Sequence, residues 1–126
     1  MANNYLLMSA WLNIPVGTGD RAREICAKLD ADEDVDWSVE SGYIWFKSEE
    51  SCDLDLVAAM AEALVEELDI DMPFVCSWAY TCSKMRPGEF GGGAFVVRRG
   101  CETVWVDAVH EALARPYTTR RMKNET

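Results

Sequence analysis

The stretch of residues 82–93 holds the residue types best suited to binding chemistry. Its sequence, CSKMRPGEFGGG, places two bases ahead of three consecutive glycines. Arg86 could bind a phosphate or carboxylate through two parallel hydrogen bonds, and Lys84 adds a second positive charge. Glycines let backbone amides approach a ligand closely and adopt positive φ. The candidate ligand-binding residues are Lys84, Arg86, Glu89, Phe90, Gly91, Gly92 and Gly93, and the ligand would be small and phosphorylated or otherwise anionic.

The same stretch also has a purely structural interpretation. Its spacing matches neither G-x-x-x-x-G-K-[ST] nor a G-x-G-x-x-G that opens a helix, so no known nucleotide-binding loop is predicted. It could instead be a hairpin loop longer than the usual 2–5 residues. In that case the glycines would form a bulge and Phe90 would pack on the core.

The segment Cys-Ser-Lys-x-Arg-Pro-Gly-Glu-Phe-Gly-Gly-Gly-Ala resembles a loop of small, uncharacterised proteins of bacteriophages and prophages. The resemblance covers about residues 78–94 and leaves the remainder of the chain unmatched. No activity is assigned to those proteins, so no catalytic residue is carried over. What the resemblance implies is a setting: a phage-type protein made inside a bacterium, where accessory proteins often inhibit host defences.

Acidic residues form the second candidate. Residues 30–71 contain 15 acids and a single base, Lys47, for a net charge of -14. Asp30-x-Asp32-x-Asp34 resembles the start of a calcium loop, but Val35 stands where glycine is required and Ser41 where a bidentate Glu is required. We therefore predict no calcium site. An acidic helix face could imitate nucleic acid toward a basic protein, or simply be solvated, and its residues are Glu62, Glu66 and Glu67.

Covalent catalysis would require Cys82. It lies near Lys84 and Arg86, whose positive charges would favour the thiolate. The only histidine, His110, would have to lie beside this thiol together with an orienting acid. Cys76 and Cys82 also fit the pattern of small buried residues. No familiar spacing provides four zinc ligands, so we predict no metal site. We also predict no cofactor and no catalytic residue.

Exposed aromatic residues are the third candidate. All five tryptophans fall in predicted strands. Tyr43 and Trp45 share one strand face with Lys47. If helices leave that sheet face uncovered, Tyr43 and Trp45 form an interface of the kind that anchors protein partners. Core packing is the alternative for most of these aromatic side chains.

The elements that must position these residues follow from hydrophobic spacing. Residues 5–13 are apolar at nearly every position, which is typical of an internal strand covered on both faces. Thr18 or Asp20 could cap a helix at 20–29. Alternating patterns predict a hairpin at 35–46 and a strand at 74–82, and an apolar stripe predicts a helix from 54 to 68. This order predicts a ferredoxin-like βαββαβ antiparallel sheet with both helices on one face.

The remaining residues predict additions to that unit. Residues 94–97 and 103–106 form a C-terminal β-hairpin, and Asp107 caps a short helix that ends before Pro116. A different α+β sheet, in which this hairpin supplies central strands, is the alternative. We expect one domain at residues 1–116 and a polar, basic tail at 117–126.

Composition limits the classes of function. The 126 residues suffice for one core, and the net charge of -10 opposes direct binding of nucleic acid. The first residues lack the features of a signal peptide, and no apolar run is long enough to span a bilayer. With five cysteines and no export, we expect reduced thiols and a cytoplasmic protein without membrane contact, in the host cytosol if the chain is phage-encoded.

Two functions follow as hypotheses. The first is a small, acidic, non-enzymatic binding protein that inhibits a host defence machine by binding one of its proteins. Its interface would use Tyr43, Trp45 and the acidic helix face, and a homodimer formed through the sheet face would fit the same residues. The second is a binder of a small anionic ligand through the glycine-rich loop.

Overall fold

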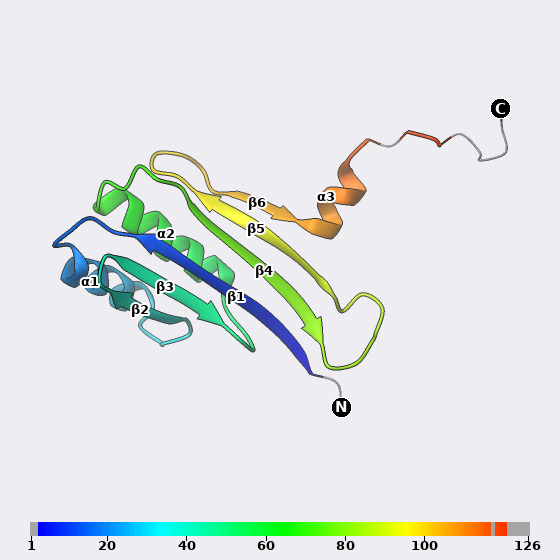
Figure 1. Cartoon of the computed structure of the whole chain (residues 1–126), viewed down its shortest axis with the longest axis horizontal. Helices are drawn as coiled ribbons and strands as arrows, with labels where there is room; N and C mark the ends of the chain where they lie inside the picture. Colours follow the sequence, from blue (N-terminus) through cyan, green and yellow to red (C-terminus); the bar gives the residue numbers. More distant parts are fainter. Residues whose placement is uncertain (1–2, 117, 121–126) are drawn as a thin grey trace.

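The computed structural model describes residues 3–116 and 118–120, and Figure 1 shows the arrangement of its elements. Most of the predicted tail, residue 117 and residues 121–126, lies outside the described residues. The elements run in the predicted order and are β1 (Asn4–Asn13), α1 (Gly19–Leu29), β2 (Asp36–Glu40), β3 (Tyr43–Ser48), α2 (Leu54–Glu67), β4 (Phe74–Cys82), β5 (Gly91–Val97), β6 (Val104–Asp107) and α3 (Ala108–Ala114).

All six strands form one antiparallel sheet. The strand order is β2-β3-β1-β4-β5-β6, and each neighbouring pair is antiparallel. The α+β class is therefore confirmed. The C-terminal hairpin of β5 and β6 continues the sheet outward from β4, so the alternative in which this hairpin supplies central strands is wrong.

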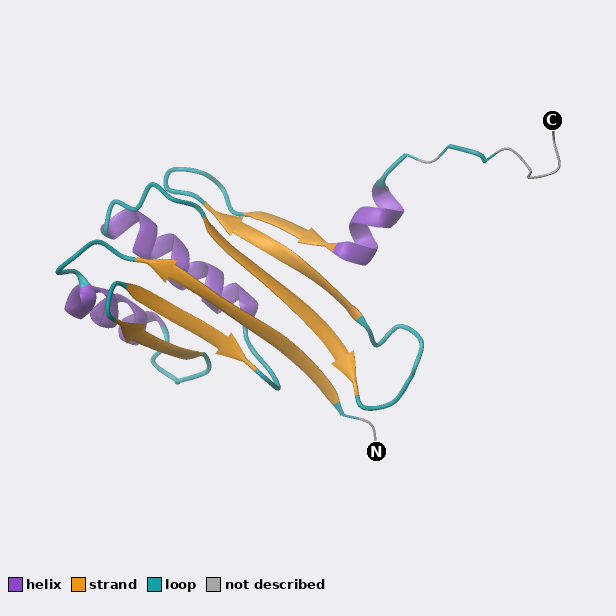
Figure 2. Ribbon diagram, viewed as in Figure 1, coloured by secondary structure: helices purple, strands orange, loops and turns teal. Residues whose placement is uncertain are grey.

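Helices α1 and α2 lie side by side on one face of the sheet, behind it in the view of Figure 2. The predicted stripe of α2 faces the core, and its buried residues include Val57, Ala61 and Leu64. Asp53 caps α2, because its Oδ1 accepts the amide of Leu56 at 3.1 Å. At α1 the predicted side-chain cap is absent, since Thr18 Oγ1 instead donates to the Pro15 carbonyl at 2.6 Å.

Strand β1 is internal, as predicted, but only one of its faces is covered. Leu6, Met8, Ala10 and Leu12 alternate with exposed residues, and Trp11 is 67% exposed. The prediction that both faces of this strand are covered is therefore wrong. The second face of β1 is uncovered because α1 and α2 both lie on the same side of the sheet, so the apolar residues of the other face remain at the surface. We call this surface the open face.

The core lies between the sheet and the two large helices. Three phenylalanines from different strands pack at its centre in tilted and edge-on arrangements. The ring centroid of Phe74 lies 5.6 Å from that of Phe46 and 5.9 Å from that of Phe95. Cys26 and Cys76 are fully buried here, and burial raises the pKa of each thiol to about 12.

Helix α3, which follows β6, stands apart from this core. The predicted cap is confirmed, since Asp107 Oδ1 accepts the amides of Val109 and His110 at 3.1 Å. However, α3 buries none of its residues. In Figure 1 it extends beyond the end of β6, away from α1 and α2.

Candidate functional site

The glycine triplet belongs to the sheet and not to the loop. Strand β5 begins at Gly91, and the three glycines pair with Tyr80, Ala79 and Trp78 of β4. The loop therefore spans only residues 83–90. The predicted boundary was wrong because glycine is depleted in strands, and a run of three normally indicates a turn.

Close contacts explain two of these glycines. A Cβ on Gly93 would overlap the Val106 carbonyl oxygen and lie 2.7 Å from the Trp78 ring. A Cβ on Gly92 would lie 2.5 Å from the Trp78 carbonyl oxygen. Gly91 has no such constraint, because its nearest neighbour is a Tyr80 ring carbon at 4.0 Å. Gly93 thus leaves room for the Trp78 ring, which lies across β5 with its centroid 5.9 Å from that of Trp105, whereas Gly92 allows close approach of the β4 backbone.

The loop does not gather its predicted ligand-binding residues around one cavity. Lys84 and Arg86 are both exposed. A depression of about 320 Å³ beside the loop is lined by Glu89 and Phe90 together with Asn4, Tyr80, Thr81 and Gly88. Its charged lining residue is therefore a carboxylate, which repels anions.

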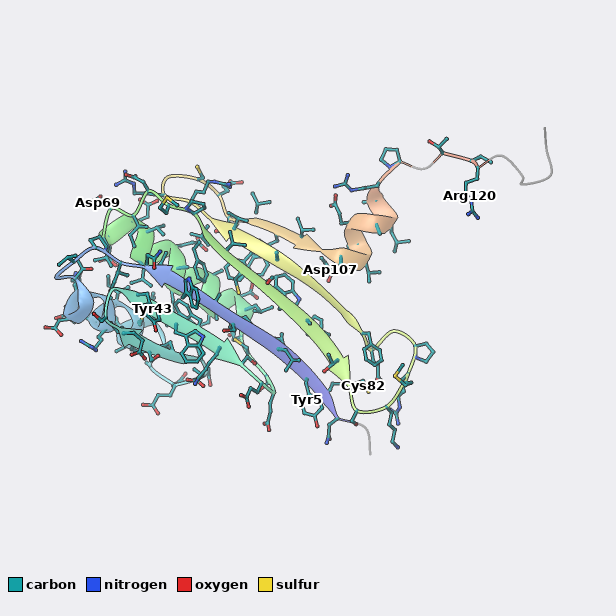
Figure 3. All side chains as sticks on the ribbon, in the orientation of Figure 1. Tyr5, Tyr43, Asp69, Cys82, Asp107 and Arg120 are labelled. Atoms are coloured by element: carbon teal, nitrogen blue, oxygen red, sulfur yellow. The ribbon has the colours of Figure 1, made fainter. Side chains whose placement is uncertain are left out.

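Cys82 is paired with an acid of its own loop. Its Sγ donates to Glu89 Oε2 at 2.9 Å. His110 lies in α3, which starts directly after Asp107, and Figure 3 shows Asp107 and Cys82 well apart. The structure does not bring the cysteine and the histidine together as a nucleophile and its base.

The acidic residues near the end of α2 form contacts within the chain. Glu67 pairs with Arg21 of α1 at 2.6 Å, and Glu66 accepts the backbone amide of Gly100 in the β5–β6 turn. In the same turn Arg99 pairs with Asp69 and Asp71, which follow α2. Two of the three acidic residues predicted to face a partner therefore bind groups within their own chain.

The predicted interface residues also divide between opposite sides of the molecule. Glu62, Glu66 and Glu67 lie on the helix layer, whereas Tyr43 and Trp45 lie on the open face. They cannot contact one partner surface of ordinary size together.

Asp30, the first residue of the calcium-like pattern, has a structural role. It is only 4% exposed. The amides of Asp34 and Val35 donate to its carboxylate at 2.8 and 3.1 Å, and Trp37 Nε1 donates at 3.2 Å. Among the described residues, no group of three His, Cys, Asp or Glu side chains could hold a metal ion.

Aromatic residues are concentrated on the part of the open face where β1 and β3 pair. Trp11 pairs with Trp45 in the β1–β3 register, and its ring lies 6.0 Å from that of Tyr43. Trp45 Nε1 donates to Ser9 Oγ at 2.9 Å, while Lys47 Nζ lies 4.4 Å from the Trp45 ring centroid. These contacts hold the Trp45 ring in place, which reduces the entropy lost when a partner binds.

Apolar residues continue across the rest of this face. On β4, Val75 is 56% exposed, and in β6 Val104 and Val106 lie on the same side. Sequence reasoning missed Trp11 and Val75. The uniformly apolar sequence of β1 gives no signal for the exposure of Trp11, because odd-numbered residues of β1 share a face with Tyr43 and Trp45 only once the two strands pair.

Two adjoining depressions hollow the open face. One of about 540 Å³ includes Trp45, Lys47, Ser77 and Ala79 in its lining, and one of about 380 Å³ includes Trp11, Met72 and Val75. Ser9 lines both. Small side chains such as Ser9 and aromatic side chains such as Trp11 and Trp45 line these depressions together.

The paired register of β1 and β4 ends at Met8 and Trp78. The smaller depression lies just past this point, over residues 9–13 of β1 and the start of β4. The β1 and β4 residues that line this depression therefore lie beyond the last regular pair of these two strands.

No protein-family model, curated protein or solved structure matches this chain. Within the described part of the chain, none of the helices is long and apolar enough to cross a bilayer.

Proposed function

We propose that this chain is a non-enzymatic binding protein that docks a partner protein on its open face. The observation that carries the proposal is the 67% exposure of Trp11 beside Tyr43 and Trp45. Tryptophan and tyrosine are the residues most enriched at the centres of protein interfaces. A sheet face that is apolar, hollowed and uncovered by helices fits a protein surface better than a small molecule.

The partner would be a host protein. The resemblance of residues 82–94 to phage proteins supports a setting in the bacterial cytosol, where a protein of a defence machine is a suitable target. Blocking such a machine needs only a stable contact and no reaction, which agrees with the separation of Cys82 from His110.

The fold of this binding protein would be an extended ferredoxin-like one. The order β2-β3-β1-β4, with α1 and α2 on one face as connections, supports this assignment for residues 4–82. On this interpretation β5, β6 and α3 are additions that lengthen the sheet and widen its open face.

The test compares one variant of the open face with a matched control. Trp11→Ser removes the exposed anchor, whereas Val16→Ser changes an apolar, fully exposed residue in the loop after β1. Each protein is immobilised and exposed to host lysate, and a partner retained by the wild type is purified and titrated against all three. Trp11→Ser should weaken its binding by roughly 30-fold, the effect of a hot-spot residue worth about 2 kcal/mol.

Val16→Ser should bind the partner as the wild type does. The proposal fails if Trp11→Ser retains full affinity, or if no protein is retained by the wild type under any condition. Circular dichroism of each variant verifies that the fold is unchanged.

A further inference from the structure

The two edges of the sheet differ in how they are protected. At one edge, β2 carries exposed charges at both ends, Asp36 and Glu40, and Ser38 Oγ donates to Glu40 at 3.0 Å. At the other edge, β6 reads Val-Trp-Val-Asp. Sheets usually guard their edges with charges, prolines or bulges, because an unguarded apolar edge pairs with other strands. Strand β2 has a charge at each end, whereas β6 has one only at its last residue, Asp107.

The segment of β6 and α3 also exposes apolar side chains that the described part of the chain leaves uncovered. Val109 and Leu113 are four residues apart and therefore lie on one side of α3, and Leu113 is 79% exposed. A helix of seven residues is not stable by itself in water. The exposed large apolar residues of this segment are Val104, Trp105, Val106, Val109 and Leu113.

We propose that β6 pairs antiparallel with β6 of a second copy of this chain, about a two-fold axis at Trp105. The sequence Val104-Trp105-Val106 is the same in both directions, so this pairing sets Trp105 against Trp105 and Val104 against Val106. Each side chain then meets an apolar neighbour on the same sheet face.

Aromatic packing holds Trp105 in a cluster beside this axis. Its ring centroid lies 4.6 Å from Phe95 and 5.9 Å from Trp78, and the Trp78 and Phe95 centroids are 6.4 Å apart, so the three rings form a triangle. Trp105 is nevertheless 42% exposed. Part of this side chain therefore stays available to the Trp105 of the second copy.

Charges at the two ends of β6 are complementary under the same rotation. The turn before β6 carries Arg98, Arg99 and Glu102, a net charge of +1, and the segment after it carries Asp107, Glu111 and Arg115, a net charge of -1, with Glu111 paired to Arg115 at 2.8 Å. Antiparallel pairing places the turn of one copy beside the start of α3 in the other. Arg98 is exposed and forms no ion pair with any residue that the structure describes, so it is free to approach that acidic turn.

The size of a stable interface explains why α3 is needed. Specific interfaces bury about 1,600 Å² in total, which a pair of four-residue strands does not reach. Val109 and Leu113 supply further apolar area next to the paired strands. The proposed dimer uses the sheet edge and does not depend on the open face being a docking site.

The test measures the mass of the full chain in solution by sedimentation equilibrium. We expect a dimer, at twice the chain mass of 14.2 kDa. Val104→Lys places a charge at the paired edge of both copies and should raise the dissociation constant at least tenfold. The matched control Val75→Lys, on β4 in the middle of the open face, should leave it unchanged.

Hydrogen exchange provides a readout that needs no variant. The outward amides of β6 should exchange more slowly as the protein concentration rises, whereas those of the β2 edge should not change. A monomer at all concentrations up to about 1 mM overturns the proposal. It is also overturned if Val75→Lys dissociates the dimer and Val104→Lys does not, since that result assigns the contact to the open face.

Discussion

A buried carboxylate connects α1 to β2. Asp30 accepts three hydrogen bonds, two from backbone amides and one from the Trp37 indole, in a site that water hardly reaches. Buried charges are tolerated only when their hydrogen bonds are satisfied, as they are here. Asp30-x-Asp32-x-Asp34 resembles the start of a calcium loop, for which we predict no calcium site, and the structure shows that Asp30 binds backbone amides and an indole of its own chain.

Removing this carboxylate should destabilise the fold. Asp30→Ala leaves buried donors without an acceptor, so we expect the free energy of unfolding to fall by about 2–3 kcal/mol. Asp32→Ala, at an exposed position two residues on, should change it by less than about 0.5 kcal/mol. Urea unfolding of the three proteins measures both values. Equal effects of the two substitutions would show that the Asp30 hydrogen bonds contribute nothing.

At the scale of elements, β5 depends on having no side chain where Trp78 crosses it. Gly93→Ala places a Cβ against the Trp78 ring and the Val106 carbonyl, so either β6 or the ring must move. We expect a loss of about 1–3 kcal/mol, the usual cost of overpacking. Gly91→Ala meets no atom closer than 4.0 Å and should be nearly neutral.

Thermal unfolding of the two glycine variants separates packing from other roles of the triplet. If all three glycines served mainly to bring amides to a ligand, the two substitutions would have similar small effects on stability. A Gly93→Ala protein as stable as Gly91→Ala would contradict the packing explanation. The tryptophan fluorescence of the protein, to which Trp78 contributes with four other tryptophans, provides a second signal of the rearrangement.

Local sequence patterns were sufficient to predict the helices and strands but not which of their faces are covered. The stripe of α2 and the alternation in β2 and β4 depend on neighbouring residues, so their spacing predicts them well. Whether β1 is covered on both faces depends on where two distant helices pack, and its uniformly apolar sequence is compatible with either outcome. The role of Gly93 likewise depends on Trp78, which is a neighbour only after β4 and β5 pair.

The candidate site was predictable only in part for the same reason. Tyr43 and Trp45 were identified because their strand face is visible in the sequence. Trp11 was missed, since its exposure depends on the side chosen by α1 and α2. The acidic residues Glu67 and Glu66 were assigned to a partner, but their ion pair and hydrogen bond are with residues 46 and 34 positions away.

On the scale of the whole molecule, one sheet presents three different environments. One face is covered by α1 and α2, the opposite face is apolar and hollowed, and one of the two edges is unguarded. Pairing through the β6 edge would join two open faces into one surface of twelve strands, because each copy contributes six. A dimer of this kind would present two docking sites on the same side, so that a partner with repeated subunits could be bound with added avidity.

The buried thiols make the stability of the whole fold dependent on alkaline pH. Burial raises the pKa of Cys26 and Cys76 from 9.0 to about 12, and that of Cys52 to about 11. The unfolded chain loses these protons near pH 9, whereas the folded chain retains them. Their contribution is therefore fully present below pH 9 and is lost as the pH rises toward 12.

The double variant Cys26→Ala and Cys76→Ala isolates this effect from other alkaline titrations. The variant lacks two of these thiols, so its free energy of unfolding should decline less steeply above about pH 9 than that of the wild type. Urea unfolding between about pH 8 and about pH 10.5 measures the two slopes. Parallel slopes would show that the thiols ionise equally easily in both states, and the buried environment of the core that covers one sheet face would then need revision.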